Sequence, residues 1–352
     1  MKIVLTGGGT AGHVMPNLAL VPFLRPAFEI AYVGSEGGLE RELVQDLPFF
    51  AIPCEKFRRS LSPKNLLIPL RLARSVREAG KVLDRLKPDR VFSKGGYVAL
   101  PVCLAARKRK IPVFLHESDA SLGLANRLCL PFCRNVFTSF PEPAGKKFIH
   151  TGAPLRPSLY RGRGAAFLAE YGLTRPLLLI MGGSLGSQAL NRAAEAALPE
   201  LLQTWNVVHL CGKNQHPEPR KGYLPLPFCD RMPDLYAAAD LAVSRAGANA
   251  AFELAALGIP TLFVPLPASV SRGDQLKNAD RLARQGCALV LRQEDLTPES
   301  LLASVSELAR KAPKLRENLK KLTRIDGTQE IAEILIVAGK RAAARRARGG
   351  AV

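Results

Sequence analysis

Short apolar runs alternate with longer segments of helical periodicity along almost the whole chain. In the first half, the apolar runs are Met1–Leu5, Glu29–Val33, Arg90–Phe92, Val113–Leu115 and Asn135–Phe137. In the second half, they are Leu177–Met181, Val207–Leu210, Leu241–Val243, Thr261–Val264 and Ala288–Leu291. Parallel βαβ units require this alternation of short strands with helices. The pattern therefore predicts an α/β protein built on doubly wound parallel sheets.

One strand–loop–helix pattern occurs twice, and its second copy begins about half-way along the chain. Met1–Leu5 is followed by the glycine-rich segment Gly7–Gly12 and then by a helical pattern. Leu177–Met181 is followed in the same way by Gly182–Ser187 and another helical pattern. The repetition predicts two Rossmann-like domains, each opening on a strand and a glycine loop.

The length of the chain supports the same division. A chain of 352 residues exceeds one ordinary core, because domains commonly have about 150 residues. We therefore expect an N-terminal Rossmann-like domain at 1–155 and a C-terminal Rossmann-like domain at 156–328, facing a cleft, with a hinge near Thr151–Pro154. A helical stretch at about 329–344 is expected to pack back on the first domain.

Composition places the chain among folded proteins. Hydrophobic residues make up 47% and charged residues 23%, which excludes a disordered, collagen-like or coiled-coil protein. The sequence has no run of about 18 uncharged apolar residues and no signal-peptide pattern, so we expect a chain that is neither membrane-spanning nor secreted. Its seven cysteines lack CxxC spacing, which favours reduced thiols and no metal site.

Charge is the unusual property of the composition. The formal net charge is +20, enough to attract the molecule to polyanions at low salt. Basic residues alternate with large apolar ones over Lys56–Lys87, whereas at Lys340–Arg348 they do not. The first cluster, above all Phe57–Arg71, predicts a patch for an anionic membrane surface, unless its leucines join the core. The second predicts a solvated tail. An aromatic content of 6% offers little base stacking, so no nucleic-acid partner is expected.

Both glycine loops have the chemistry of a phosphate site. A glycine loop between strand and helix lets backbone N–H groups approach an anion at the positive end of the helix dipole. The alternative is that the glycines only permit a tight turn. Gly7-x-Gly9-x-x-Gly12 formally matches the dinucleotide fingerprint, but the next strand ends in Gly34-Ser35, without the acid that binds the adenosine ribose. NAD is therefore not expected as a cofactor.

Candidate catalytic and binding side chains follow the predicted strands of the first half. His13 comes directly after the glycine loop, where a neutral imidazole could accept a proton from a sugar hydroxyl or could cap the loop. Tyr97 follows another glycine turn and is expected to face the cleft. His116–Asp119 lies at a strand end, where open α/β sheets bind ligands. These groups suit hydroxyl recognition, although Asp119 could instead cap the next helix.

The second half carries a comparable set of residues. Ser244–Glu253 follows a predicted strand and includes Ala248 and Asn249, and its small residues permit a close approach of backbone to phosphate. Glu253 is placed to accept hydrogen bonds from ribose hydroxyls, or is an ordinary acid favoured by the dipole of a first helical turn. Gln275 offers an amide group at the same sheet edge.

Together these motifs resemble the MurG family, the UDP-N-acetylglucosamine:undecaprenyl-pyrophosphoryl-MurNAc-pentapeptide N-acetylglucosaminyltransferases. The matching segments span nearly the whole chain: Gly8–His13, Gly95–Tyr97, His116–Glu117, Thr151–Arg156, Gly182–Gly186, Ser244–Gly247, Phe252–Glu253 and Gln275–Ala279. The resemblance implies a GT-B fold and an inverting, metal-independent transfer of N-acetylglucosamine (GlcNAc) from UDP-GlcNAc to the lipid-linked acceptor. This step converts lipid I to lipid II in peptidoglycan synthesis. The resemblance also implies a peripheral enzyme on the cytoplasmic face of the plasma membrane.

The resemblance further implies roles for single residues of the first domain. Three loop residues would lie beside donor and acceptor, namely Thr10, Ala11 and Gly12. His13 or Glu117 would take the proton of the acceptor hydroxyl. Two departures from the family pattern occur here: Ala11 replaces a common glycine, and Ser118-Asp119 stands where Gln-Asn is usual. The second departure leaves the contact with the acceptor or hexosamine open.

In the second domain, the resemblance assigns the donor. Arg156 and Ser184 would hold the UDP phosphates, Glu253 the ribose, and Gln275 the GlcNAc hydroxyls. The uracil would lie against the backbone near two further residues, Cys229 and Met232. Asp274 replaces a common glutamine, which leaves the selectivity for the donor sugar open.

Other functions stay open on the residues alone. Another membrane-associated GT-B enzyme, such as a diacylglycerol glycosyltransferase, would share the donor-binding half of the chain and the association with membranes. A basic nucleic-acid-binding protein would show strongly salt-dependent binding to nucleic acid. An NAD-dependent oxidoreductase would need a ribose-binding acid at the end of the second strand. A turnover assay with paired acceptors separates the two transferases.

Overall fold

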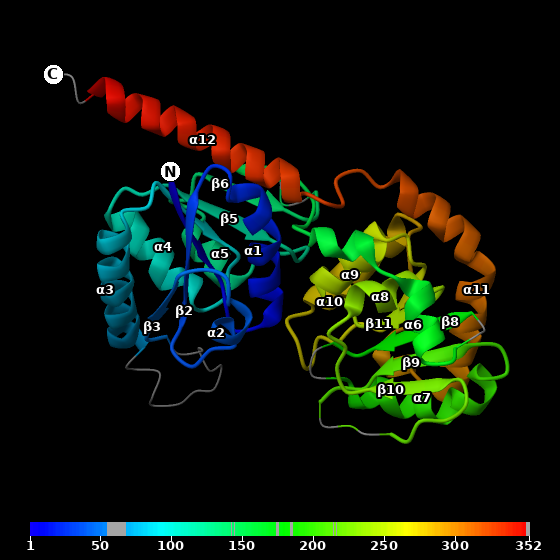
Figure 1. Cartoon of the computed structure of the whole chain (residues 1–352). Helices are drawn as coiled ribbons and strands as arrows, with labels where there is room; N and C mark the ends of the chain where they lie inside the picture. The colour runs from blue at the N-terminus through cyan, green and yellow to red at the C-terminus, as the bar shows by residue number, and fades with distance from the viewer. Residues whose placement is uncertain are drawn as a thin grey trace. The chain divides into compact units, whose positions relative to one another are not determined.

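The computed structural model divides the chain into two units. It describes residues 1–54, 68–141, 143, 145–173, 176–183, 186–213, 215 and 217–349, with the backbone alone for 340–349. Unit 1 comprises Met1–Arg156 and Asp326–Val352, and unit 2 comprises Pro157–Ile325. Each unit holds one parallel sheet flanked by helices (Figure 1). The predicted α/β class with parallel sheets is therefore confirmed.

The sheet of unit 1 has seven strands in the order β3-β2-β1-β4-β5-β6-β7, and every neighbouring pair is parallel. The strands are β1 (Lys2–Thr6), β2 (Glu29–Ser35), β3 (Phe49–Ile52), β4 (Arg90–Ser93), β5 (Val113–Glu117), β6 (Asn135–Thr138) and β7 (Phe148–His150). The central strands read as nearly continuous apolar runs because helices cover both faces of a parallel sheet.

Two helical layers enclose this sheet. The helices are α1 (Ala11–Leu24), α2 (Glu40–Leu43), α3 (Ile68–Leu86), α4 (Ala99–Lys108), α5 (Leu124–Cys129) and α12 (Thr328–Gly349). Helices α3, α4 and α5 supply one apolar core, which includes Val76 and Val102. Helices α1 and α12 supply the core on the opposite face, where Leu20 and Leu335 are fully buried. The central strands are buried because helices pack on both faces of the sheet.

The C-terminal helix is fixed to unit 1 by buried polar contacts as well as by apolar packing. Arg90 on β4 is 1% exposed, and its guanidinium donates a short hydrogen bond to the carbonyl oxygen of Leu335. At the start of α12, Thr328 Oγ1 accepts a hydrogen bond from Leu155 N at 2.7 Å. Helix α12 lies beside α1 in Figure 1. It therefore belongs to the N-terminal core although it ends the chain.

Unit 2 repeats the architecture with a six-stranded parallel sheet in the order β10-β9-β8-β11-β12-β13. Its strands are β8 (Leu177–Met181), β9 (Asn206–Leu210), β10 (Tyr223–Leu226), β11 (Leu241–Ser244), β12 (Thr261–Phe263) and β13 (Leu289–Val290). Its helices are η2 (Pro157–Arg161), α6 (Gly164–Glu170), α7 (Gln188–Leu201), α8 (Met232–Ala238), α9 (Ala248–Ala256), α10 (Asp274–Arg284), η3 (Gln293–Asp295) and α11 (Pro298–Lys321). Helices α7 and α11 share one core with this sheet.

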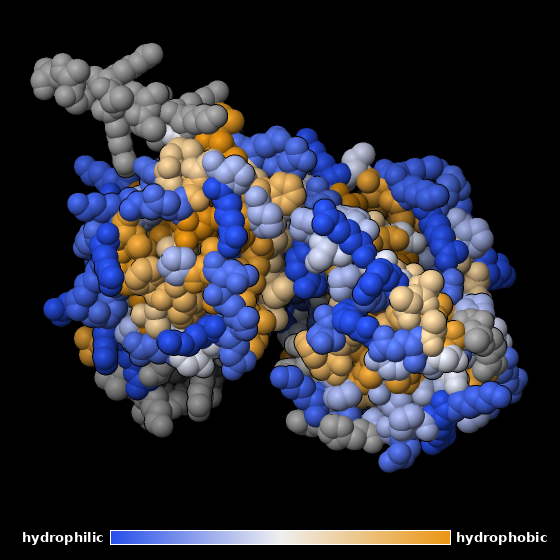
Figure 2. Space-filling view, viewed as in Figure 1, coloured by the Kyte–Doolittle hydropathy of each residue, from blue (hydrophilic) through white to orange (hydrophobic). Residues whose placement is uncertain are grey.

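The remaining features concern surface and thiols. Hydrophilic residues make up much of the viewed surface of both units, with hydrophobic residues showing between them (Figure 2). All seven cysteines are free thiols, as the composition predicts. Over the described residues, no helix combines the length and the apolar character needed to cross a membrane. Of the predicted membrane patch Phe57–Arg71, residues 57–67 lie outside the described residues.

Candidate functional site

Strand ends bring the first-half motifs to one edge of the unit 1 sheet. Strand order reverses between β1 and β4, and open α/β sheets bind ligands at such switch points, beyond the carboxyl ends of the strands. Gly7–His13 follows β1, Lys94–Tyr97 follows β4, and Glu117–Asp119 extends from the end of β5. The structure therefore gathers the predicted acceptor-side residues at a place where α/β domains carry out chemistry.

A buried carboxylate of this chain occupies the first glycine loop. Glu40, at the start of α2, is fully buried, and its Oε1 accepts a hydrogen bond from Gly9 N at 2.5 Å. Its Oε2 accepts another from Ser35 Oγ at 3.0 Å, and that hydroxyl lies 3.3 Å from the Tyr97 hydroxyl. The loop pattern assigns such N–H groups to a phosphate. The structure corrects this at Gly9, whose N–H is bonded to an internal anion.

The surrounding glycines leave no room for side chains. A Cβ at Gly8 would lie 1.8 Å from Glu40 Oε1, and one at Gly96 would lie 2.3 Å from the carbonyl oxygen of Gly8. A Cβ at Gly9 would lie 2.7 Å from the Tyr97 ring, and Gly9 has a φ of +88°, a region that favours glycine. These glycines therefore do more than permit a turn, because they let Glu40 and Tyr97 pack onto the loop.

His13 lies in the first turn of α1, directly after Thr10 and Ala11. Thr10 is the N-cap residue, but its hydroxyl does not cap the helix; instead Thr10 Oγ1 lies 3.0 Å from His13 Nδ1. When Nδ1–H donates to this hydroxyl, the basic lone pair is on Nε2, which is the tautomer that a general base needs. Gly12 beside it is exposed. The loop therefore orients an imidazole that can accept a proton.

Glu117, the other candidate base, is bound into its own loop. Its Oε1 accepts a hydrogen bond from Asp119 N at 3.2 Å. Its Oε2 accepts hydrogen bonds from Gly123 N at 2.8 Å and Asn126 Nδ2 at 3.0 Å. Burial raises the pKa of Glu117. The carboxylate therefore holds residues 119–126 in place, which favours a positioning role over proton transfer.

His116 has a structural position behind this loop. It is fully buried, and its Nε2 lies 3.1 Å from the carbonyl oxygen of Gly152. Burial, assisted by the nearby charge of Lys94, lowers the pKa of His116 well below its usual value. A neutral imidazole here donates to Gly152 and joins β5 to the segment that follows β7.

The corresponding edge of unit 2 lies at the carboxyl ends of β8, β11 and β12. Strand order reverses between β8 and β11, which is the switch point of this sheet. Gly182–Ser187 follows β8, but the predicted phosphate contact Ser184 lies outside the described residues. Ser187 is the N-cap of α7, where its Oγ accepts a hydrogen bond from Leu190 N at 3.4 Å. A helix N-terminus therefore points to this edge, as anion binding requires.

Arg245 connects the segments around this switch point. Its buried guanidinium donates to Ser187 Oγ at 2.6 Å, to the carbonyl oxygen of Val264 at 2.9 Å and to Gln293 Oε1 at 2.5 Å. These three acceptors are neutral, and burial lowers the pKa of Arg245. A cation held beside the second glycine loop adds a positive field that suits a diphosphate.

Glu253 lies in the second turn of α9, because the helix begins at Ala248 and its first turn contains no acidic residue. This position rules out the alternative interpretation as a first-turn acid. Glu253 Oε2 accepts a hydrogen bond from the Tyr236 hydroxyl on α8 at 3.0 Å, which fixes the half-buried carboxylate. Ala248 and Asn249 form the start of α9, with their N–H groups at its positive end.

The segment around Gln275 is also fixed by the backbone. Gln275 Oε1 accepts a hydrogen bond from Leu266 N at 3.1 Å, so its amide NH2 is the group that a ligand would meet. Asp274 forms an ion pair with Arg272 at 2.7 Å. Asn278 is buried and donates to the carbonyl oxygen of Ala246 at 3.1 Å. Helix α10 is thereby attached to the loop after β11.

The remaining predicted residues lie apart in the chain. Arg156 is half-buried at the end of the first stretch of unit 1. Cys229 is buried, which raises the pKa of its thiol, and Met232 begins α8. Among the described residues, no group of three or more His, Cys, Asp and Glu side chains could hold a metal ion.

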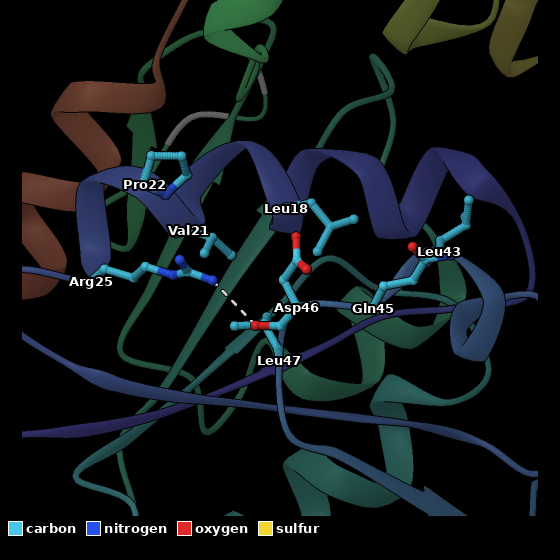
Figure 3. Close-up of a pocket in the computed structure, with 8 residues that line it drawn as sticks. All are labelled: Leu18, Val21, Pro22, Arg25, Leu43, Gln45, Asp46 and Leu47. Atoms are coloured by element: carbon cyan, nitrogen blue, oxygen red, sulfur yellow. Dashed lines mark hydrogen bonds between the residues drawn. The ribbon is translucent and has the colours of Figure 1, made fainter. Parts of the chain in front are cut away.

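A separate groove of about 480 Å³ lies along the C-terminal half of α1 (Figure 3). One face of α1 and the segment after α2 line it, with Leu18, Val21, Arg25 and Leu47 among the residues. Arg25 Nη2 donates to the carbonyl oxygen of Asp46 at 3.2 Å across it. Its lining residues on α1, from Leu18 to Arg25, lie about 8–18 Å along the helix from His13 at 1.5 Å per residue.

Three residues of these sites carried no predicted role. Glu40 follows a Gly-rich turn and bonds a loop 31 residues away, which no local pattern reveals. Arg245 lies inside the matched segment Ser244–Gly247, and Lys94 comes directly before the matched segment Gly95–Tyr97. The available signal was their position: a basic residue directly after an apolar strand in a parallel sheet lies at the ligand edge.

Comparisons with known proteins agree with this geometry. Residues 3–138 match the glycosyltransferase family 28 N-terminal domain, and residues 177–334 match the glycosyltransferase family 28 C-terminal domain. The UDP-N-acetylglucosamine–N-acetylmuramyl-(pentapeptide) pyrophosphoryl-undecaprenol N-acetylglucosamine transferase of Lachnoclostridium phytofermentans is 44% identical over 94% of this chain and 97% of that protein. The transferase of the same name from Clostridium perfringens is 41% identical over 95% of this chain and 97% of its own.

A solved structure supports the same relationship. The crystal structure of Acinetobacter baumannii MurG matches with a TM-score of 0.75 and 29% identity, over 95% of this chain and 98% of that one. The two parallel-sheet units and this match establish the GT-B fold that the resemblance implies. The chain therefore belongs to glycosyltransferase family 28 and, within it, to the MurG family of N-acetylglucosamine transferases.

Proposed function

We propose that this protein transfers GlcNAc from UDP-GlcNAc to undecaprenyl-pyrophosphoryl-MurNAc-pentapeptide, the step from lipid I to lipid II in peptidoglycan synthesis. The observation that carries the proposal is identity of 41–44% to enzymes named for this reaction over 94–95% of the chain. The two switch-point sites support it, because one offers a base and the other a cationic edge for a diphosphate. An enzyme that transfers GlcNAc from UDP-GlcNAc is a hexosyltransferase.

The donor is assigned to unit 2 and to Arg156, which ends the first stretch of unit 1. Glu253, oriented by Tyr236, is suited to accept hydrogen bonds from ribose hydroxyls, and the amide NH2 of Gln275 is suited to donate to the sugar. The N-terminus of α7 and the buried Arg245 favour the diphosphate. Cys229 and Met232 stay the predicted neighbours of uracil, and Ser184 and Arg156 the predicted phosphate contacts. In transfer, negative charge accumulates on the UDP leaving group, and these donors would stabilise it.

The acceptor is assigned to unit 1. In the reaction, a hydroxyl of the acceptor sugar attacks the anomeric carbon of GlcNAc as the bond to UDP breaks. We assign the proton of that hydroxyl to His13 Nε2, because the Thr10 hydroxyl pairs with Nδ1. Glu117 has both carboxylate oxygens bonded within its own loop. We therefore propose that Glu117 positions the loop, and that Tyr97 and Asp119 lie beside the acceptor.

Metal dependence gives a first prediction. We expect EDTA to leave the rate of transfer unchanged, because the proposed donors to the leaving diphosphate are arginine, loop amides and a helix terminus. The measurement is the release of UDP in the presence of both substrates, with and without EDTA, and with added Mg²⁺. A strict requirement for Mg²⁺ would contradict the metal-independent transfer.

The acceptor carries a long prenyl chain, so the enzyme has to reach it at a membrane. Extracting that chain is implausible at about 0.8 kcal/mol for each buried CH₂. Exposed basic residues form a stripe along α3, namely Arg71, Arg74, Arg77 and Lys81. Leu70 at the start of α3 is 69% exposed, and Leu124 and Leu128 on α5 are 57% and 49% exposed. We propose that these residues of α3 and α5 contact anionic lipid on the cytoplasmic face of the plasma membrane.

Vesicle binding gives a second prediction. Replacing Arg71, Arg74 and Arg77 with glutamate should lower sedimentation with phosphatidylglycerol vesicles at least tenfold, since each cation near the surface contributes about 1 kcal/mol. A matched control reverses three exposed charges on α11, at Arg310, Lys314 and Lys320. We expect the control to bind vesicles normally and both variants to bind UDP. Equal binding by the α3 variant and the native protein would remove the proposed surface.

The experiment that tests the proposed reaction measures its dependence on both substrates. We expect product to form from UDP-GlcNAc with the undecaprenyl-linked MurNAc-pentapeptide, and the rate to fall sharply when UDP-glucose replaces UDP-GlcNAc. Release of UDP at the same rate without the lipid acceptor would mean that the protein hydrolyses the donor, and the proposal would be wrong.

A further inference from the structure

Lys94 is a buried cation at the acceptor-side switch point. It follows β4 directly and is 3% exposed. Its backbone N–H donates to the carbonyl oxygen of Thr6 at 2.9 Å, which extends the pairing of β4 with β1. Its Nζ donates a short hydrogen bond to Ser118 Oγ, in the loop after β5. Burial of an ammonium is costly unless hydrogen bonds and opposite charges compensate it. The surroundings of Lys94 therefore have to provide negative charge.

The residues on either side of Ser118 are acidic: Glu117 ends β5, and Asp119 follows in the loop. Burial lowers the pKa of Lys94 to about 8, and the charges of Glu117 and Asp119 oppose this decrease. Burial raises the pKa of Glu117, and Asp119 raises it further whereas Lys94 lowers it. His116, the other titratable group that senses Lys94, is held neutral. Lys94 therefore offsets one of two neighbouring negative charges in a loop that is fixed by Glu117.

An uncompensated pair of carboxylates would be unfavourable at this edge. The proposed acceptor carries a diphosphate, and like charges at a binding edge cost affinity. We propose that Lys94 is a positioning residue that acts as a pair with Asp119, with its ammonium holding the Ser118–Asp119 turn and neutralising it for an anionic acceptor. This inference rests on the proposed function.

A double-mutant cycle tests the pairing. Lys94→Met should lower kcat/KM for the lipid acceptor about tenfold, through KM for the acceptor, with KM for UDP-GlcNAc unchanged. Adding Asp119→Asn should restore most of the loss, because the unbalanced carboxylate is removed with the ammonium. Lys108→Met, an exposed lysine on α4, is the matched control and should behave as the native protein. Losses that simply multiply in the double variant would overturn the proposal.

The pH profile gives a readout that a merely structural role would not move. Because the ammonium is lost above about pH 8, kcat/KM for the acceptor should fall on the alkaline side in the native protein. Lys94→Met should lack this decrease. Asp119→Asn should shift it to lower pH, because the carboxylate that stabilises the charged form is gone. The same alkaline profile in all three proteins would contradict the pairing, and the Asp119→Asn comparison holds even if Lys94→Met does not fold.

Stability separates failure of this inference from failure of the proposed function. The pKa of Lys94, about 8 when folded, lies below its ordinary value of 10.5. The unfolded chain therefore binds more protons between these values, and the Lys94 contribution to stability rises with pH across that window. Between pH 8 and 10.5, the Tm of Lys94→Met should therefore fall relative to that of the native protein. In Asp119→Asn, the rise in the Lys94 contribution to stability should begin at lower pH. A pH-independent difference would overturn the pairing even if no sugar were transferred.

Discussion

Replacing His13 with alanine should lower the turnover of sugar transfer by about a hundredfold to ten-thousandfold, the usual contribution of a general base. The affinity for UDP-GlcNAc should change by no more than a few-fold, because the proposed donor contacts are made by Arg156 and by residues of unit 2. We expect this effect because Thr10 Oγ1 lies 3.0 Å from His13 Nδ1, and a proton on Nδ1 leaves the lone pair of Nε2 for the proposed base role. Steady-state kinetics with the lipid acceptor and calorimetric titration with UDP-GlcNAc measure the two quantities.

A second substitution distinguishes the base from the capping alternative. The amide of His13→Asn can still donate to the Thr10 hydroxyl, but it cannot take up a proton. A base role requires the asparagine variant to lose turnover as severely as the alanine variant. If asparagine restores most of the activity, then His13 only supports the loop, and the source of the base has to be sought at Glu117.

Removing the carboxylate of Glu40 is the second change with a large expected effect. Glu40→Ala leaves the N–H of Gly9 and the hydroxyl of Ser35 without this acceptor, and it removes the link to Tyr97. Unpaired buried donors cost about 1–3 kcal/mol each, so the free energy of unfolding should fall by roughly 2–4 kcal/mol. A catalytic loop misplaced by about 1 Å can lose a factor of 100, so kcat/KM for the acceptor should fall about hundredfold.

Two controls accompany this variant. Glu40→Gln retains an oxygen for Gly9 N and should lose much less activity than Glu40→Ala. Glu42→Ala removes an exposed carboxylate from the same helix and should leave stability and kinetics unchanged. Denaturant unfolding and kinetics with both substrates give the comparison. Native kinetics in folded Glu40→Ala would show that the carboxylate does not order the loop.

The parallel sheets could be predicted because their central strands carry the strongest signal. The run Leu177–Met181 is buried at every position, so its apolar pattern directly reflects coverage on both faces. Three of the four edge strands were missed, whereas β13 (Leu289–Val290) was predicted within the run Ala288–Leu291. Phe148–His150 has only three residues, and Tyr223–Leu226 contains a proline, which sequence patterns assign to loops. The strand Phe49–Ile52 at the other edge was missed as well. Such strands are defined by pairing with a neighbour more than by their own residues.

The candidate site divides in the same way. Motifs that follow strong strands place His13, Glu117 and Glu253 near sheet edges, because strand ends meet there in any parallel sheet. What a side chain bonds to could not be predicted. Glu40 accepts a hydrogen bond from Gly9, which is 31 residues away in the sequence, and Arg245 donates one to Ser187, which is 58 residues away. These partners depend on tertiary packing, so they could not be predicted from the sequence.

The most direct test of the central claim is a competition between two acceptors in one reaction. The native protein is incubated with UDP-GlcNAc and equal amounts of undecaprenyl-pyrophosphoryl-MurNAc-pentapeptide and diacylglycerol in mixed vesicles, and products are identified by mass. We expect GlcNAc to be added to the MurNAc-pentapeptide lipid alone. Addition of sugar to diacylglycerol and not to the undecaprenyl lipid would contradict the assignment, even with the fold and the donor site intact.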